Sequence, residues 1–447
     1  MSGSASPMLK SPPATPMLYA HTTLDADRGL TVDGVSLADI AAEYSTPTFV
    51  YSIPRVLEKF RGIRDAFTAH LDASSPLSIH FSMKANPSSA VIRALVKDGA
   101  GIDCVSAGEV HKALAFGCPA SHIVFAGVGK APAEIEYAVE RRVGWFNVEN
   151  EEELAHIQRA CEKLNVVKTN VALRVNPNVA ANTHPSIATG HGGAKFGLPM
   201  DTVSRLLQSH DQYTRLRFGG LHAHIGSQLG DVQPTVDAIT RVVELAKLCP
   251  DVTSLNIGGG FPVQYKPDFA GEEATSALMP TAANFAAAVA PVVKGYEIML
   301  EPGRSIAADA GVLLTRSLYR KDQAEMTMLI VDASMVEVMR PALYGAYHDV
   351  VPVEAAPALQ DTIMTTVVGP VCESTDVINK GVSLQASVVR PDALFAIMTC
   401  GAYCSSMAGN YNARPLCAEV AITSPGKYSL CRKRQTFDDL LKDEIFN

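Results

Sequence analysis

One lysine stands at the end of an apolar run, in a place where its amine could react. The run begins near Ser78, reaches Lys84, and is followed at once by the turn signal Asn86-Pro87. A lysine at such a position is most often a solvated strand end, because its charged amine favours water. The alternative is a Schiff-base lysine, whose amine becomes nucleophilic when burial or a neighbouring cation lowers its pKa. The ends of the other predicted strands decide between the two.

Charged, imidazole or glycine-rich groups also end most of those strands. They are Asp103, Arg174, His224, Gly258-Gly259-Gly260, and Glu301 with Arg304 three residues on. A purely structural protein would place turn residues there. Each group alone has an ordinary structural interpretation, and together they indicate a cofactor site at one edge of a parallel sheet.

The three consecutive glycines directly follow the apolar run Ser254–Ile257. Glycine lets the backbone approach an anion and point N–H groups at it, although glycines after a strand more often form a plain turn. The pattern is not G-x-G-x-x-G and therefore does not support a dinucleotide. A single phosphate fits it better.

The segment Glu301-Pro302-Gly303-Arg304 combines a carboxylate with a guanidinium. The two could form a surface ion pair, which contributes little to stability. The functional interpretation is that Glu301 keeps a ring nitrogen protonated while Arg304 binds a substrate carboxylate through two parallel hydrogen bonds.

Two histidines, His222 and His224, lie at a period of two and would share one face of a strand. Such spacing could suit a metal, and a lone histidine is more often part of the core. No third His, Cys or carboxylate stands at ligand spacing nearby, so we expect no metal. We expect His224 to stack on a ring and Ser227 to donate to a phosphate.

The elements that must position these groups alternate between residues 77 and 304. Short apolar runs predict strands at Ile79–Lys84, Gly101–Ser106, Ile123–Ala126, Trp145–Val148, Val171–Val175, Gly220–Ile225, Ser254–Ile257 and Ile298–Glu301. Longer stretches between them have helical spacing: Ala90–Lys97, Ala107–Ala115, Ala133–Glu140, Glu151–Leu164, Met200–Gln208, Val232–Leu248 and Met279–Lys294. This rhythm is typical of an α/β fold of the (β/α)8 TIM-barrel type, with a doubly wound open sheet as the alternative.

After Arg304 the pattern changes to strand-like runs with few long helical stretches, such as Met326–Val331 and Thr362–Val368. This change indicates a second, β-rich domain of sandwich or barrel-like form. Residues 30–50 also look strand-like and are expected to join it. The predicted organisation is a disordered tail at 1–18, a β-rich domain made of 19–47 with 305–447, and a cofactor-binding barrel at 48–304.

Composition narrows the class of protein. The chain has 447 residues, of which 47% are hydrophobic and 19% charged, as expected of a globular enzyme with two domains. A formal net charge of −8 and a pI near 5.9 argue against nucleic acid or an anionic membrane as a partner. No apolar run is long enough to span a bilayer. Nine scattered cysteines without a C-x-x-C pair, and a Ser/Pro-rich start without an apolar segment, predict a cytoplasmic protein rather than a secreted one.

Seven motifs resemble those of the alanine-racemase-fold, pyridoxal-phosphate-dependent decarboxylases. In chain order they are FSMKANP, HIGSQ, NIGGGFP, EPGR, RPALYGAYH, GPVCESTD and GAYCSSMAGNYNARP. The resemblance runs from about residue 30 to about residue 430 and is nearest to the branch that decarboxylates diaminopimelate. Each motif is modest alone, and the seven together are very specific.

The resemblance implies roles for the residues singled out above. Lys84 would hold pyridoxal 5'-phosphate covalently, His224 would stack on the pyridine ring, and Glu301 would pair with the ring nitrogen. A protonated ring accepts the electrons left when carbon dioxide departs, and a buried carboxylate favours that protonated form. The remaining cofactor-binding residues would be Asp103, Arg174, Ser227, Gly258, Gly259, Gly260, Gly303, Arg304 and Tyr403.

Two further residues, Cys372 and Glu373, lie in the predicted β-rich domain. The resemblance implies that they reach the site from the other subunit of a homodimer with shared active sites. Cys372 would be the catalytic proton donor and Glu373 would bind the distal ammonium of an amino-acid substrate. A free cysteine is more commonly a small buried hydrophobe. The substrate pocket would be completed by Arg304, Arg340, Tyr344 and Tyr403.

The implied activity is the decarboxylation of meso-2,6-diaminopimelate to L-lysine and carbon dioxide, the last step of lysine biosynthesis. The distal end of this substrate carries both charges, and Glu373 with Arg340 supplies one partner for each, whereas an ornithine site would need no arginine. The alternative is a sister decarboxylase of the ornithine, arginine or carboxynorspermidine type. A racemase of this fold would need two bases and does not use the CES motif. A pseudoenzyme would be expected to have lost the lysine or its partners.

Some positions depart from the family pattern. Thr375 stands where glycine is common after CES, Cys404 follows Tyr403, and Ala408-Gly409 replaces small polar residues. The residues leading to the lysine, His80 to Met83, also differ. None of these changes removes a charged group, so they bear on substrate preference alone.

Overall fold

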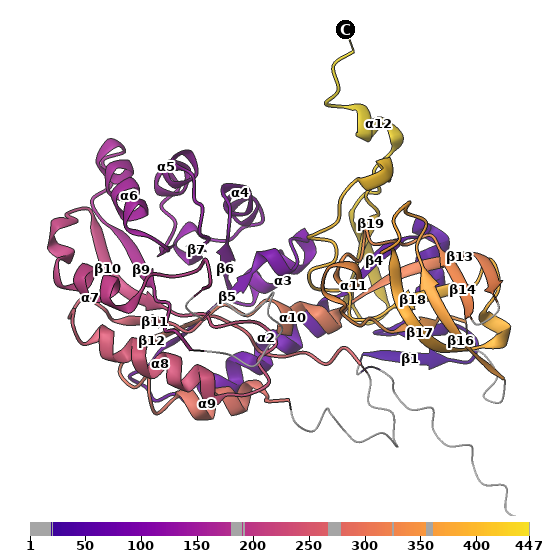
Figure 1. The fold of residues 1–447 in the computed structure, drawn as a ribbon, viewed down its shortest axis with the longest axis horizontal. Coiled ribbons are helices and arrows are strands. Elements are labelled where there is room, and N and C mark those ends of the chain that lie inside the picture. Colours follow the sequence, from indigo (N-terminus) through magenta and orange to yellow (C-terminus); the bar gives the residue numbers. More distant parts are fainter. Residues whose placement is uncertain are drawn as a thin grey trace, which may run out of the picture.

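The computed structural model describes residues 19, 21–179, 190, 193–266, 279–323, 326–354 and 361–446. The predicted tail at 1–18 lies outside the described residues. Two bodies lie side by side in Figure 1, a barrel drawn in purple to red and a β-rich domain drawn mainly in orange and yellow.

The first body is a closed barrel of eight parallel strands, in the order β10-β11-β12-β5-β6-β7-β8-β9. Pairing of Ile298 with Leu77 closes the ring, which confirms the TIM-barrel prediction and excludes the open sheet. The strands are β5 (Leu77–Ser82), β6 (Gly101–Cys104), β7 (Ile123–Phe125), β8 (Trp145–Val148), β9 (Thr169–Arg174), β10 (Leu216–His222), β11 (Ser254–Asn256) and β12 (Glu297–Leu300).

Seven of the eight barrel strands end one to three residues earlier than predicted, because their ladders stop where the chain turns over the rim, and three of these early ends matter for the site. β5 ends at Ser82, so Lys84 lies in a 3-10 turn, Met83–Ala85. Likewise β10 ends two residues before His224, and β12 ends one residue before Glu301. These side chains therefore belong to loops at the carboxyl rim, where the chemistry of such barrels gathers.

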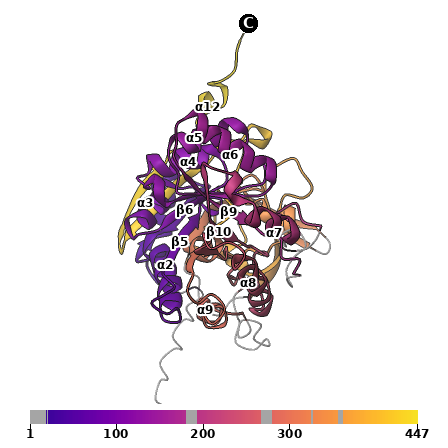
Figure 2. The same cartoon turned by 90° about the vertical axis from the view of Figure 1, so that its left-hand side faces the viewer.

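Helices surround the strands, as Figure 2 shows. Their starts follow ordinary capping chemistry, as at Asn150, whose side chain accepts the N–H of Glu153 at the start of a first turn rich in glutamate. The predicted helix at Met279–Lys294 is shorter in the structure. The helices are α2 (Ile53–Thr68), α3 (Ser89–Lys97), α4 (Ala107–Ala115), α5 (Pro132–Glu140), α6 (Glu151–Lys163), α7 (Met200–Gln208), α8 (Gln233–Ala246) and α9 (Ala282–Val289).

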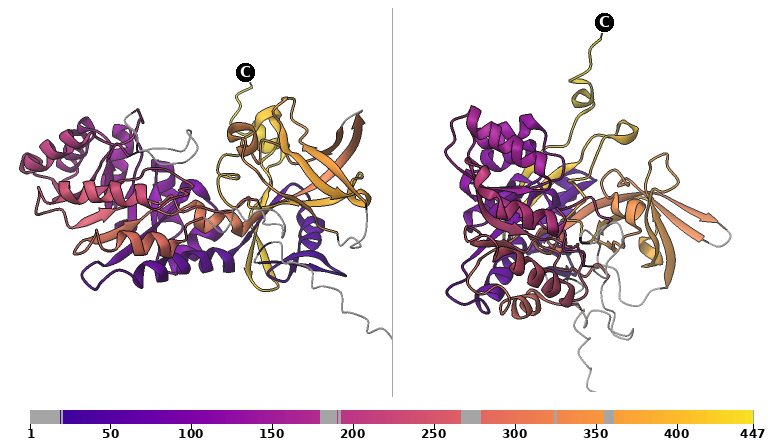
Figure 3. Two further views of the ribbon diagram at one scale, coloured as in Figure 1. Left: turned by 60° about the horizontal axis from the view of Figure 1, so that its bottom comes forward. Right: turned by 60° about the vertical axis from the view of Figure 1, so that its left-hand side comes forward.

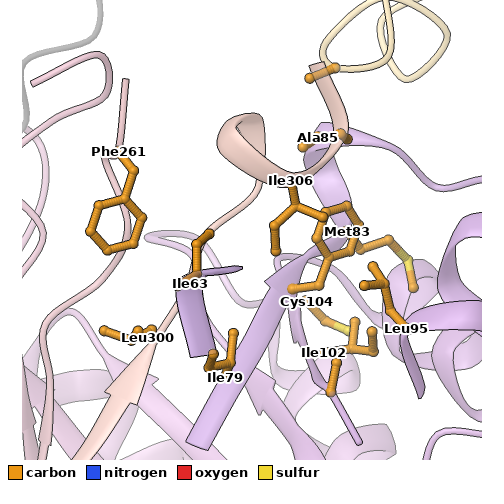
Figure 4. Close-up of a cluster of buried hydrophobic side chains, with 14 of the residues drawn as sticks. Ile63, Ile79, Met83, Ala85, Leu95, Ile102, Cys104, Phe261, Leu300 and Ile306 are labelled. Carbon is orange, nitrogen blue, oxygen red and sulfur yellow. The ribbon is translucent and has the colours of Figure 1, made fainter. Parts of the chain in front are cut away.

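The turn that carries Lys84 is anchored by apolar neighbours. Met83 and Ala85, on either side of the lysine, are 0% and 1% exposed. Both belong to the buried cluster of Figure 4, where the side chain of Met83 lies above those of Leu95 and Ile102. Because both neighbours are buried in the core, the lysine between them is left to extend into the space above the barrel.

The second body is a nine-stranded sheet, seen on the right of Figure 1 and again in Figure 3. Its main path runs β17-β16-β14-β13-β4-β19-β20, with β15 and β18 joined to it beside β13. The strand β4 (Thr48–Ser52) pairs with β13 and β19, so it lies in this sheet although the predicted boundary at residue 48 assigned it to the barrel. The other strands are β13 (Gly311–Gln323), β14 (Met326–Val331), β15 (Val350–Pro352), β16 (Thr362–Val368), β17 (Val377–Gln385), β18 (Leu394–Ile397), β19 (Ala418–Ser424) and β20 (Lys427–Arg432).

Short elements complete the β-rich domain and join it to the barrel. A three-stranded sheet precedes the barrel, and short helices follow the last barrel strand and end the chain. None of the described helices combines the length and the apolar character needed to cross a membrane. These elements are β1 (Thr22–Asp25), β2 (Gly29–Val32), β3 (Val35–Ser36), α1 (Leu37–Tyr44), α10 (Arg304–Ala307), α11 (Arg340–Tyr344) and α12 (Phe437–Leu441).

Candidate active site

A cavity of about 400 Å³ opens above the carboxyl ends of the barrel strands, between the barrel and α11. A narrower niche of about 40 Å³ adjoins it, lined by Gly259, Gly260 and Gly303 among others. Many of the residues predicted from the sequence meet here. Those that line the cavity are Lys84, Arg174, His224, Ser227, Glu301, Arg304, Arg340, Tyr344 and Tyr403.

Lys84 faces a buried carboxylate across the cavity floor. Its Nζ lies 3.6 Å from Oδ2 of Asp103, and its side chain is 44% exposed, toward the cavity. Burial alone would lower the pKa of Lys84, yet the charges of Asp103, Tyr403 and Glu301 raise it above its usual range. This direction is opposite to the one we expected from the sequence, because the acidic partners outweigh the loss of water.

Asp103 is held in place from one side only. The hydroxyl of Ser82 donates to Oδ2 at 2.7 Å, while Oδ1 is buried and has no hydrogen-bond partner among the described residues. Burial, and after it the charge of Glu301, raises the pKa of Asp103. A buried carboxylate oxygen without a partner is costly, which is typical of a group that awaits a ligand or a water.

Glu301 lies at the centre of a buried polar network. Its Oε1 accepts hydrogen bonds from Asn147 at 2.8 Å and Asn256 at 2.6 Å, and its Oε2 lies 3.3 Å from Nε2 of His222. Burial would raise the pKa of Glu301, but His222, Lys84 and Asn256 hold it well below its usual range. Glu301 is therefore a negative charge kept in the interior by its neighbours.

Sequence reasoning missed three residues of that network. Asn147 and Asn256 were counted as parts of apolar strands, and His222 was set aside in favour of His224. These residues could have been found as polar side chains inside buried parallel strands, because burying a polar group is costly unless it is hydrogen-bonded. All three are at most 2% exposed.

The glycine loop is built to approach a bound group closely. Gly258 and Gly260 have φ of +69° and +95°, which favours glycine. A Cβ on Gly259 would lie 2.4 Å from the carbonyl oxygen of Glu301, and one on Gly303 would lie 2.9 Å from Cβ of Ala85. Larger residues would therefore collide with the rim at these positions.

His224 presents a neutral ring to the cavity. Its Nδ1 accepts the N–H of Gly259 at 3.4 Å. Burial, followed by the charges of Arg174 and Lys84, lowers the pKa of His224 to about 3. An uncharged imidazole is suited to stacking on a flat ring.

Three arginines approach the cavity, and each is oriented by its neighbours. Arg174 pairs with Glu149 at 2.5 Å. Arg304 donates to Ser227 at 3.1 Å and lies over the ring of Tyr403, whose backbone has a φ of +58°. The third, Arg340 on α11, is 6% exposed and comes from the β-rich domain.

Cys372 and Glu373 do not reach the cavity of their own chain. Both are exposed and neither lines it. The N–H of Cys372 donates to Oδ1 of Asn412 at 2.9 Å on the β-rich domain. One chain therefore brings together the predicted cofactor and arginine groups without these two residues.

Comparison with known proteins places the chain among its relatives. Residues 55–308 match the pyridoxal binding domain of the pyridoxal-dependent decarboxylases. A diaminopimelate decarboxylase of Zymomonas mobilis is 38% identical over 423 residues, which cover 93% of this chain and 96% of that protein. Another, from Aquifex aeolicus, is 35% identical and covers 94% of this chain and 96% of its own length.

Solved structures agree with the sequence relatives. Diaminopimelate decarboxylase of M. jannaschii in co-complex with L-lysine has a TM-score of 0.87 at 31% identity, covering 96% of this chain and 98% of that one. The Helicobacter pylori enzyme complexed with L-lysine has a TM-score of 0.82 at 33% identity, covering 91% and 98%. The family resemblance read from the seven motifs is thus confirmed, and the chain belongs to the diaminopimelate decarboxylase family of pyridoxal-dependent decarboxylases.

Proposed function

We propose that the protein removes carbon dioxide from meso-2,6-diaminopimelate and releases L-lysine, with pyridoxal 5'-phosphate as its cofactor. The observation that carries the proposal is the meeting of Lys84, an ionised Glu301 and three buried arginines at one cavity. The nine cysteines of the protein are all free, as expected if the enzyme acts in the reducing cytoplasm.

The described residues fit this cofactor. Gly259 and Gly303 line the niche, and a side chain at either position would collide with neighbouring atoms. Their bare backbone lets a phosphate approach closely. The partnerless Oδ1 of Asp103 and the buried charge of Glu301 offer contacts to a polar ring. When bound, the cofactor supplies an electron sink for the electrons of the broken C–C bond.

Each barrel residue then has one task. Lys84 would hold the cofactor through Nζ, and Asp103 would stabilise positive charge at that nitrogen. Glu301 would keep a proton on the ring nitrogen, because its own proton affinity is held low by His222 and Asn256. His224 would stack on the ring. The phosphate would be bound by Ser227, by backbone groups of Gly258–Gly260 and of Gly303-Arg304, and by the hydroxyl of Tyr403, and Arg174 would also contact the cofactor.

The substrate is held by charge at its far end. Arg304 and Arg340, with Tyr344, bind the carboxylate that the product keeps. Cys372 and Glu373 belong to the site of a second copy of the chain, since both are exposed on their own. There the thiol of Cys372 returns a proton to the carbon that has lost carbon dioxide, and Glu373 binds the distal ammonium.

The substrate is tested with a panel of meso-diaminopimelate, L-ornithine, L-lysine and L-arginine, assayed with and without added pyridoxal phosphate. We expect kcat/KM for meso-diaminopimelate to exceed the others by about 100-fold or more, because the others leave a buried arginine unpaired. A higher value for ornithine or lysine would move the protein to a sister decarboxylase. Inversion of stereochemistry without release of gas would indicate a racemase.

Shared active sites are tested by mixing two inactive variants, K84A and C372A. In a mixed dimer one site keeps both Lys84 and Cys372, so after subunit exchange of equal amounts we expect about a quarter of the wild-type activity. The matched control mixes K84A with E301Q. Lys84 and Glu301 lie in the same barrel, so this pair restores nothing. Equal recovery in both mixtures, or none in the first, would contradict a site completed by Cys372 of a second copy.

A further inference from the structure

The two arginines that face the cavity from different domains share a common support, Tyr265. Its hydroxyl accepts a hydrogen bond from Nη1 of Arg304 at 2.9 Å. The guanidinium of Arg340 lies over the face of the same ring, with Cζ 4.3 Å from the ring centre. Arg304 begins α10, directly after the barrel, whereas Arg340 begins α11 in the β-rich domain. One phenol therefore sets the spacing between two cations across the domain boundary.

His348 supports the second arginine from behind. It is fully buried, and its ring packs edge-on against Tyr265 with centres 5.5 Å apart. Its Nε2 lies 2.7 Å from Nη1 of Arg340, and its Nδ1 lies 2.9 Å from the carbonyl oxygen of Met398. A guanidinium only donates and a carbonyl only accepts, so Nδ1 carries the hydrogen and Nε2 accepts from Arg340.

The charge state of His348 agrees with that assignment. Burial, and after it the charge of Arg340, lowers the pKa of His348 to about 3. The ring is therefore neutral at physiological pH and keeps a lone pair for the arginine. A protonated histidine would instead repel the guanidinium.

These contacts leave donors available on both arginines. Among the described residues, Ser227 and Tyr265 take two of the five N–H donors of Arg304, and His348 takes one of those of Arg340. Arginine side chains are flexible, and holding them in one geometry before binding removes an entropic cost from recognition of a carboxylate.

We propose that Tyr265 and His348 are positioning residues that hold Arg304 and Arg340 together as one clamp for the carboxylate that the product keeps. The inference rests on the proposed function, and it adds a specificity: the clamp recognises that carboxylate and contributes little to the rest of the substrate. Neither residue touches the reacting carbon in this account.

The test compares inhibition by L-lysine and by cadaverine, which differ by that one carboxylate. In the holoenzyme with meso-diaminopimelate as substrate, Y265F should raise the inhibition constant of L-lysine and the KM about tenfold, because a hydrogen bond to a charged group is lost. The inhibition constant of cadaverine should change less than about twofold, and kcat should fall less than KM rises. H348L should behave in the same way, and H348Q, which retains an acceptor, should recover most of the loss.

Y319F is the matched control, since it removes a hydroxyl at a site that is 66% exposed and outside the cavity. The visible absorbance of the bound cofactor checks that each variant is folded and loaded. Parallel changes for L-lysine and cadaverine, or no change for either, would overturn the clamp. If the wild type does not decarboxylate meso-diaminopimelate, the proposed function fails instead, so the two failures are distinct.

Discussion

Replacement of Lys84 by alanine will lower kcat for meso-diaminopimelate by about 10³-fold or more, because in the proposed function this residue holds the cofactor covalently. The amine extends from a turn whose flanking residues are buried, and it faces Asp103 at 3.6 Å. The purified variant should also lack the yellow colour of the wild type. Carbon dioxide release and visible absorbance measure the two effects.

Two control variants test whether the effect of K84A is specific to that lysine. K97A, at the exposed end of α3, should remain coloured and active. Lys195 also lines the cavity, so K195A separates the two amines. Loss of colour in K195A together with its retention in K84A would transfer the covalent role to Lys195.

Replacement of Glu301 by glutamine will lower kcat by about 10²–10³-fold while the cofactor stays bound. Glutamine keeps the shape of the side chain and its contact with Asn147 and Asn256, but it removes the buried negative charge that, in the proposed function, favours a proton on the ring nitrogen. The colour of the protein should therefore persist while carbon dioxide release falls.

The same strand offers the control. E297Q changes a glutamate at the opposite end of β12, where the side chain accepts from Ser254 at 2.7 Å, away from the cavity. This variant should keep nearly full activity. An E301Q enzyme within about twofold of the wild type would show that the charge at residue 301 has no part in the electron sink.

The barrel could be predicted from the sequence, because alternating strands and helices produce local hydrophobic patterns of different period. The strand that ends near Lys84 and the one that ends near Glu301 were found in this way, with errors of a few residues where the ladder stops. The pattern could not say that Thr48–Ser52 leaves the barrel, since a short buried strand reads the same in either domain. That choice depends on β13 and β19, which lie far along the chain.

The residues that could be predicted to meet at the cavity are charged groups at strand ends or residues inside the seven motifs. The residues that support these groups are harder to predict, because each one acts through contact with a residue distant in the sequence. Asn256 is the last residue of β11, and its role is evident only from its hydrogen bond to Glu301. His348 stands at the end of the RPALYGAYH motif, but its hydrogen bond to Arg340 cannot be read from that motif. Tyr265 lies in a barrel loop, and only the packing of the two domains brings its ring against Arg340. Local patterns cannot report such contacts.

A covalent bond between the cofactor and the amine of Lys84 would be detected by borohydride reduction of the holoenzyme followed by peptide mass spectrometry. We expect a single reduced pyridoxyl-phosphate adduct on the peptide that contains Lys84, and no adduct in K84A. An adduct on Lys195 or on another lysine, or a wild-type protein without any adduct, would show that Lys84 does not hold the cofactor.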